Sequence, residues 1–81
     1  MTTEQIRRVW KAEPFQPFTI HLADGRKVRV PHQEFMALAP SGRTMVVWES
    51  DAFDIIDLLL VTRLHAGPNG KRRRKPGDLL N

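Results

Sequence analysis

The chain contains no cysteine, which excludes disulfide bonds and zinc sites built from thiolates. A domain of 81 residues is close to the lower limit for an independent hydrophobic core. We therefore expect any additional stability to come from packing or self-association. The absence of cysteine also fits a reducing compartment.

Long apolar runs are missing as well. The longest stretch, IIDLLLV, is interrupted by Asp57 and is too short to span a bilayer. Residues 1–11 alternate charged and apolar side chains, so no secretory leader is predicted. We expect a soluble, cytoplasmic protein without a membrane partner.

The excess positive charge is confined to one end of the chain. The formal net charge is +4, but residues 1–66 hold eight Lys or Arg and eight Asp or Glu, so this part is neutral by count. The excess comes from five consecutive cations in residues 67–81: Lys71, Arg72, Arg73, Arg74 and Lys75. Gly/Pro pairs flank this run, which predicts a flexible basic tail after a single domain at residues 1–66.

A helix is predicted over residues 2–12. Ile6, Val9 and Trp10 recur at a spacing that places them on one helix face. Thr2 and Gln5 have the spacing of a capping box, and Pro14 ends the helix.

Residues 18–30 alternate apolar and polar side chains on both sides of Asp24-Gly25, which predicts a β-hairpin. A two-residue turn would place Lys27 beside Leu22 on the buried face. A three-residue loop at residues 23–25, with Gly25 in the left-handed region, instead pairs Ile20 with Val28. We prefer the second register, which leaves one polar face: Thr19, His21, Lys27 and Arg29.

Further short strands are expected downstream. Residues 45–48, 53–57 and 61–66 are rich in β-formers, with a break near Asp57, whereas residues 34–38 fit either a helical turn or a strand. The predicted fold class is mainly β with one N-terminal helix: a small, bent-sheet barrel, Sm-like or SH3-like, of four or five antiparallel strands.

Three segments resemble a group of short, uncharacterised bacterial proteins that repeat them: PFQPFTIHLADGRKVRVPHQEF, PSGRT and DIIDLLLVT. The resemblance covers roughly residues 4–62 and implies no activity. The element order also resembles Sm-like domains, in which a helix precedes a five-stranded barrel and subunits form RNA-binding rings. Ala37 stands where that family has Asn, and Ile56-Asp57 stand where it has Arg-Gly. The resemblance therefore implies the barrel but not the family's base-binding groups.

Catalytic and metal-ligating patterns are not found. The three histidines lack a helical i, i+4 spacing, and the two serines lie in turn-like surroundings. The acidic segment Glu49, Asp51, Asp54, Asp57 does not converge on one point of a strand. We expect no enzyme activity, no cofactor, no metal and no small-molecule substrate.

The aromatic residues are expected to fill the core, because a chain of this size has little other apolar area. They are Trp10, Phe15, Phe18, Phe35, Trp48 and Phe53.

The charge pattern suggests a non-enzymatic binding module. We expect a homo-oligomer that contacts RNA or DNA backbones without reading sequence. The predicted contact residues are Lys71, Arg72, Arg73, Arg74 and Lys75, assisted by Lys27 and Arg29. The alternative is a protein-protein interaction or assembly domain without a nucleic-acid role.

Overall fold

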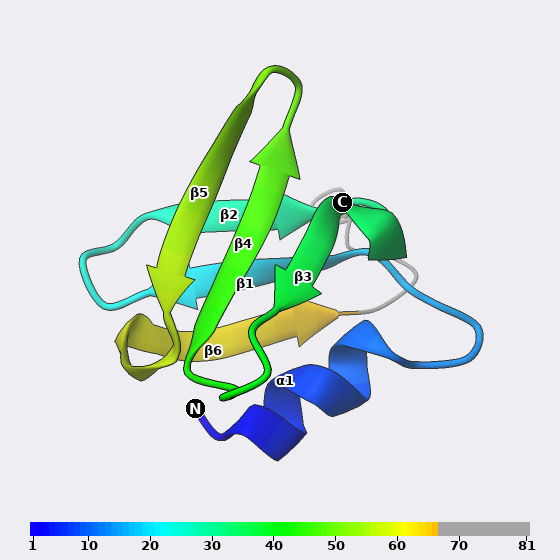
Figure 1. Cartoon of the computed structure of the whole chain (residues 1–81), viewed down its shortest axis with the longest axis horizontal. Helices are drawn as coiled ribbons and strands as arrows, with labels where there is room; N and C mark the ends of the chain where they lie inside the picture. Colours follow the sequence, from blue (N-terminus) through cyan, green and yellow to red (C-terminus); the bar gives the residue numbers. More distant parts are fainter. Residues whose placement is uncertain (67–81) are drawn as a thin grey trace, which may run out of the picture.

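The computed structural model describes residues 1–66; the predicted tail, including its five cations, lies outside the described residues. The described part is mainly β, with one short N-terminal helix and six short strands (Figure 1). We expected four or five strands. The additional strand comes from the segment whose conformation the sequence left open: Gln33–Phe35 forms a 3-10 helix (η1) and Met36–Leu38 forms strand β3.

Helix α1 (Thr3–Trp10) begins at the predicted cap. The Thr2 side chain accepts a hydrogen bond from the Gln5 backbone N–H, and the Gln5 side chain accepts from the Thr2 N–H. Two reciprocal bonds attach the other end of the helix to η1. Trp10 Nε1 donates to the Gln33 carbonyl, and Gln33 Nε2 donates to the Trp10 carbonyl, both at 2.9 Å.

One antiparallel sheet has the strand order β2-β1-β6. Strands β1 (Phe18–Leu22) and β2 (Lys27–Val30) form the predicted hairpin, with Ile20 opposite Val28. Gly25 has a φ of 92°, as the preferred three-residue loop requires. Strand β6 (Val61–Ala66) pairs with the other side of β1.

The second antiparallel sheet has the order β3-β4-β5. Strand β4 (Thr44–Glu49) joins β5 (Ala52–Asp57) through a two-residue turn. The predicted break at Asp57 is confirmed: its carboxylate accepts the Leu59 N–H at 2.9 Å and caps the 3-10 helix η2 (Leu58–Leu60), which leads into β6.

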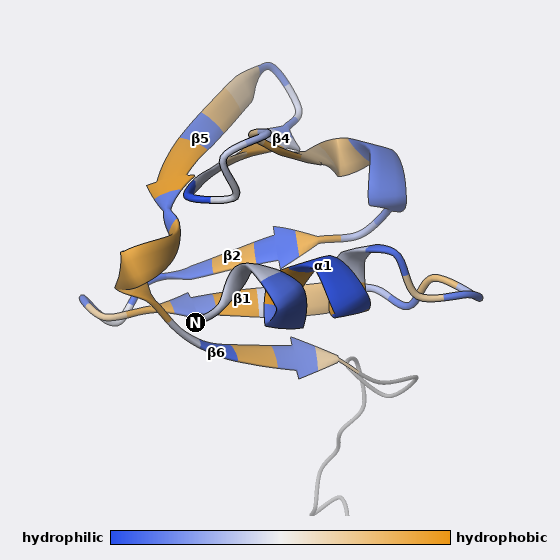
Figure 2. Cartoon of the chain, turned by 60° about the horizontal axis from the view of Figure 1, so that its bottom comes forward, coloured by the Kyte–Doolittle hydropathy of each residue, from blue (hydrophilic) through white to orange (hydrophobic). Residues whose placement is uncertain are grey.

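The two sheets form two layers, and α1 lies along one open side between them (Figure 2). The inward side chains of both sheets and Ile6 of the helix make the core, whose fully buried members are Ile6, Phe18, Ile20, Val30, Met45 and Val47. Among the described residues, no helix is long and apolar enough to cross a membrane.

The prediction that all six aromatic residues fill the core is wrong for Trp48 and Phe53. These side chains are 42% and 58% exposed and lie opposite each other on β4 and β5. Alternation along the strands explains the difference, because Met45, Val47 and Ile56 occupy the inward positions and leave Trp48 and Phe53 on the outer face.

Candidate nucleic-acid interface on one sheet

The outer face of the β2-β1-β6 sheet gathers cationic and imidazole side chains in two rows across three strands. In the first row, His21 lies between Lys27 and Arg63 in the strand register. In the second row, Thr19 lies between Arg29 and His65. We call this surface the basic face, defined by Thr19, His21, Lys27, Arg29, Arg63 and His65.

Strand spacing fixes the size of the basic face. Neighbouring strands lie about 4.8 Å apart, so each row of three residues spans about 10 Å. The two rows are two residues apart along the strands, which is about 7 Å. No outward strand position on this face holds Asp or Glu in the described part of the chain. The cations therefore lie close together without carboxylates to neutralise them.

Two side-chain contacts order the basic face. Arg29 Nη1 donates to Thr19 Oγ1 at 3.2 Å, and Arg63 Nη2 lies 3.4 Å from His21 Nε2. A guanidinium group is only a donor, so the His21 nitrogen accepts in this contact, which favours the neutral ring protonated on Nδ1. These contacts leave Lys27 and the remaining guanidinium N–H groups available to an anion.

The surroundings of His21 on this face lower the pKa of its imidazole. Partial burial of the imidazole, the charges of Arg63 and Lys27, and His65 together lower the pKa of His21 from its ordinary value. Each of these effects disfavours the protonated ring. A phosphate bound between the two rows would have the opposite effect and would favour protonation.

The structure brings Lys27 and Arg29 together on one face, as the hairpin register predicted. The other predicted contacts, Lys71, Arg72, Arg73, Arg74 and Lys75, lie outside the described residues. Arg63 and His65 were missed. Their alternation with Leu64 is visible in the sequence, but it does not tell which strand β6 joins.

A register shift between His21 and Leu22 aligns Arg63 and His65 with the basic face. Leu22 pairs with Val61, whereas His21 pairs with Arg63, so Thr62 is the extra residue of a β-bulge. The Thr62 hydroxyl donates to the His21 carbonyl at 3.2 Å. The bulge therefore lets Val61 stay in the core while Arg63 and His65 project from the basic face.

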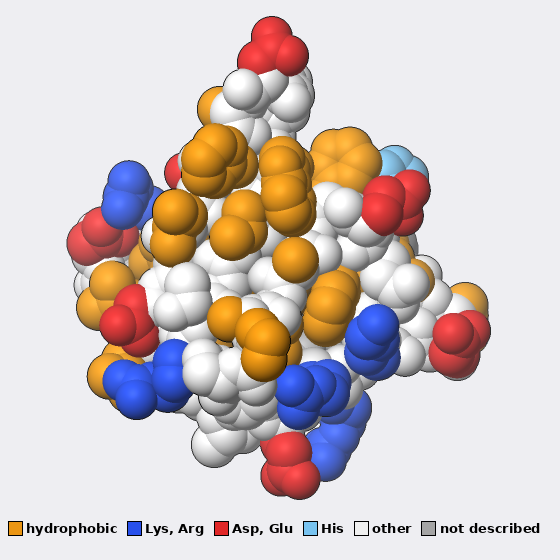
Figure 3. Space-filling model, viewed as in Figure 1, with side chains coloured by type: hydrophobic (Ala, Val, Ile, Leu, Met, Phe, Trp, Pro, Cys, Tyr) orange, Lys and Arg blue, Asp and Glu red, His pale blue; other side chains and the backbone are white. Residues whose placement is uncertain are grey.

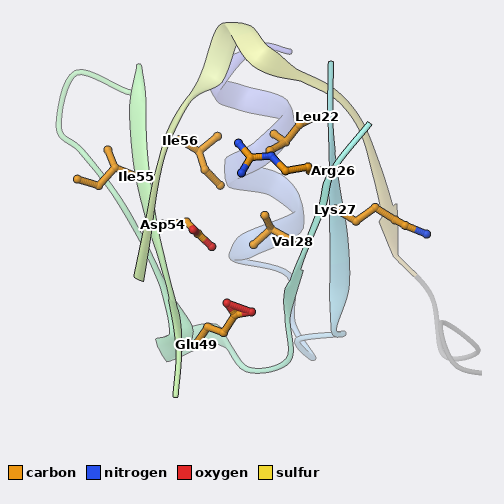
Figure 4. Close-up of a pocket in the computed structure, with 8 residues that line it drawn as sticks. All are labelled: Leu22, Arg26, Lys27, Val28, Glu49, Asp54, Ile55 and Ile56. Carbon is orange, nitrogen blue, oxygen red and sulfur yellow. The ribbon is translucent and has the colours of Figure 1, made fainter. Parts of the chain in front are cut away.

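A small cleft lies between β2 and β5, on the side of the two sheets away from α1 (Figure 4). Arg26 borders it on one side, and Glu49 and Asp54 border it on the other, whereas the Lys27 side chain points away from it. Its volume is about 170 Å³, below the roughly 300 Å³ at which ligand pockets begin. Arg26 already pairs with Asp24 at 3.0 Å on the exposed hairpin loop.

Within residues 1–66, no three His, Asp or Glu side chains are grouped closely enough to hold a metal ion. The acidic segment is dispersed by strand alternation. Asp54 is half-buried on the inner face of β5, and the Asp57 carboxylate caps η2.

The opposite layer carries an apolar face. The side chains that project outward from β3, β4 and β5 are predominantly hydrophobic, and they gather on one surface of the molecule (Figure 3). We define the apolar face by Ala37, Val46, Trp48, Phe53 and Ile55. Phe53 and Ile55 are its most exposed large members.

Comparison of the chain with protein-family models, curated proteins and solved structures gives no match. The resemblances to short bacterial proteins and to Sm-like domains therefore stay predictions.

Proposed function

We propose that this chain is a non-enzymatic module that binds the phosphate backbone of RNA or DNA through the basic face. The observation that carries the proposal is the set of three cations and two histidines on one sheet surface without a strand carboxylate. Cations beside phosphates release condensed counterions, which supplies affinity without reading bases.

The proposal includes the five cations of the predicted tail. Residue 67 follows directly after β6, whose Arg63 and His65 belong to the basic face. Four residues separate Ala66 from Lys71, so five peptide steps keep this lysine within about 18 Å of the strand end. We propose that Lys71, Arg72, Arg73, Arg74 and Lys75 contact neighbouring phosphates of the same nucleic acid.

We also propose that the two sheets are halves of a small, bent barrel of the Sm-like or SH3-like kind. The chain passes between the sheets twice, through η1 between β2 and β3 and through η2 between β5 and β6. These two passages support the barrel proposal, because in such barrels the chain bends from one layer into the other.

A second candidate function, a protein-protein interaction or assembly domain without a nucleic-acid role, is favoured by the apolar face. A contiguous apolar patch on a protein surface often marks an interaction site, whereas single scattered apolar residues do not. A backbone-binding module should bind RNA or DNA at low salt, whereas an interaction domain of this kind should not.

Titration of the full chain with a labelled RNA and a labelled DNA duplex of arbitrary sequence tests the proposal. Lys27, Arg29 and Arg63 are changed together to Gln, and the matched control changes Arg7, Lys11 and Arg43, so both variants lose three charges. We expect the slope of log affinity against log salt to fall by about two to three in the first variant only. Equal slopes in both variants would contradict the basic face as the binding surface.

A chain truncated after residue 66 tests the tail separately. We expect it to keep part of the salt-dependent affinity, because the basic face remains. If neither nucleic acid binds the full chain at low salt, the proposal is wrong and the interaction-domain alternative is favoured.

A further inference from the structure

Strand β5 is an exposed sheet edge of unusual composition. It ends the order β3-β4-β5, so no strand in residues 1–66 pairs with its outer side. Its sequence, AFDIID, contains no Lys, Arg or Pro, the residues that commonly protect such edges. Phe53 is 58% exposed and Ile55 67% exposed.

The hydrogen-bond pattern identifies which backbone groups of β5 face outward. The Leu58 N–H donates to the Arg43 carbonyl at 2.8 Å, and this pair continues the β4-β5 register. Because hydrogen-bonded and non-hydrogen-bonded pairs alternate in an antiparallel ladder, Ile56, Asp54 and Ala52 bond to β4. The N–H and C=O groups of the alternate residues, Phe53, Ile55 and Asp57, therefore point away from the sheet.

Neither carboxylate of β5 protects the exposed apolar side chains. Asp54 lies on the inner face, where it borders the cleft, whereas Ile55 points away from it (Figure 4). Asp57 is engaged in capping η2. By contrast, β2 carries Lys27 and Arg29, and β6 carries Arg63, so charges flank both outer edges of the other sheet.

We propose that β5 pairs antiparallel with β5 of a second copy of this chain, with Ile55 facing Ile55 across a twofold axis. Only Phe53, Ile55 and Asp57 have backbone groups that point outward, so hydrogen bonds between the two copies must join these residues. A twofold axis at Ile55 uses all three residues and places Phe53 opposite Asp57 of the second copy. Centring on Phe53 would bring the Ser50-Asp51 turn into the interface.

Complementarity in this register favours a second copy as the occupant. Asp57 faces Phe53 and Asp54 faces Ile56, so no carboxylate lies directly opposite another. In a twofold contact the same strand supplies both sides, so each pair of facing residues occurs twice. In this register both occurrences are compatible pairs. The pairing joins two three-stranded sheets into one and unites two apolar faces, while both basic faces remain on the other layer.

The absence of cysteine permits a direct test of the register. Paired residues on neighbouring strands have Cα atoms about 5.5 Å apart, within the range for a disulfide. Ile55→Cys should therefore give a covalent dimer under mild oxidation. In Phe53→Cys, the two sulfur-bearing residues would be four positions apart along the seam, about 13 Å, and the chain should stay uncrosslinked. Failure of Ile55→Cys to crosslink, or equal crosslinking of Phe53→Cys, would overturn the register.

The mass of the unmodified full chain provides the second measurement. Sedimentation at increasing concentration should show a twofold increase in mass. Ile55→Lys should abolish the increase, and Ala37→Lys, on the same outer face but on the far strand, should retain it. Circular dichroism checks that both variants are folded. A chain that stays monomeric up to its solubility limit would overturn the proposal, and so would an unchanged increase in folded Ile55→Lys. Neither result bears on nucleic-acid binding by the basic face.

Discussion

His21 and Arg63 face each other on adjacent strands, with His21 Nε2 and Arg63 Nη2 3.4 Å apart. With Lys27 on its other side, this imidazole lies between two permanent cations. Partial burial and these charges lower the pKa of His21, so the ring is neutral in the free protein near neutral pH.

We therefore expect nucleic-acid binding to tighten as pH falls. Bound phosphate raises the pKa of His21, because an adjacent anion favours the protonated ring. Affinity should increase from pH 7.5 to 5.5 at constant salt, and the increase ends once the ring is also protonated in the free protein. Fluorescence anisotropy of a labelled oligonucleotide measures the change.

His21→Gln should reduce this pH dependence, whereas the control His32→Gln should not, because residue 32 lies outside the basic face, next to η1. A pH profile of His21→Gln identical to that of the unmodified chain would show that this imidazole does not contact phosphate.

The two turn glycines should differ in their tolerance of a side chain. Gly25 has a φ of 92° and no atom within 4 Å of an added Cβ, so Gly25→Ala should cost only backbone strain, about 1 to 2 kcal/mol. Gly42 has a φ of 79°, and an added Cβ would lie 2.6 Å from Thr3 Cγ2. Gly42→Ala should therefore lower the free energy of unfolding further. Urea denaturation measures both, and equal losses would contradict the close packing of Thr3 on Gly42.

Two aromatic residues, Phe18 and Phe53, test which face of each sheet is buried. Phe18 is fully buried, so Phe18→Ala should reduce the free energy of unfolding by about 3 to 5 kcal/mol. Phe53→Ala removes an exposed ring and should cost less than about 1 kcal/mol in dilute solution. Comparable losses in urea titrations of the two variants would contradict the outward position of Phe53.

The reciprocal bonds between Trp10 and Gln33 should stabilise the helix against the sheets. Trp10→Phe removes the indole donor and leaves the partly buried Gln33 carbonyl without its partner, at a cost of about 1 to 3 kcal/mol. Thermal or urea unfolding checks this value. Val9→Ala is the control, since it removes apolar contact on the same helix without affecting that bond. A fully stable Trp10→Phe would show that the bond contributes nothing.

Local sequence patterns predicted much of the fold. The capping residues defined the start of α1, and alternation with Gly25 defined the hairpin register that places Lys27 and Arg29 on one surface. These features depend on neighbours in the sequence, so they can be derived without knowing the topology.

Features that depend on distant pairing were not predictable in the same way. Arg63 and His65 join the basic face only because β6 pairs with β1, more than forty residues earlier, through a bulge at Thr62. Likewise, the outward positions of Trp48 and Phe53 follow from which face of the second sheet meets the core. Composition alone had assigned these rings to the interior.

The most direct test of the basic face is the amide NMR spectrum of the full chain during titration with a short, single-stranded oligonucleotide. We expect the largest shifts at Thr19, His21, Lys27, Arg29, Arg63 and His65, and these shifts should reverse on addition of salt. Resonances of β4 and β5 should stay nearly unchanged. Shifts confined to the β3-β4-β5 sheet, or none at low salt, would contradict the account.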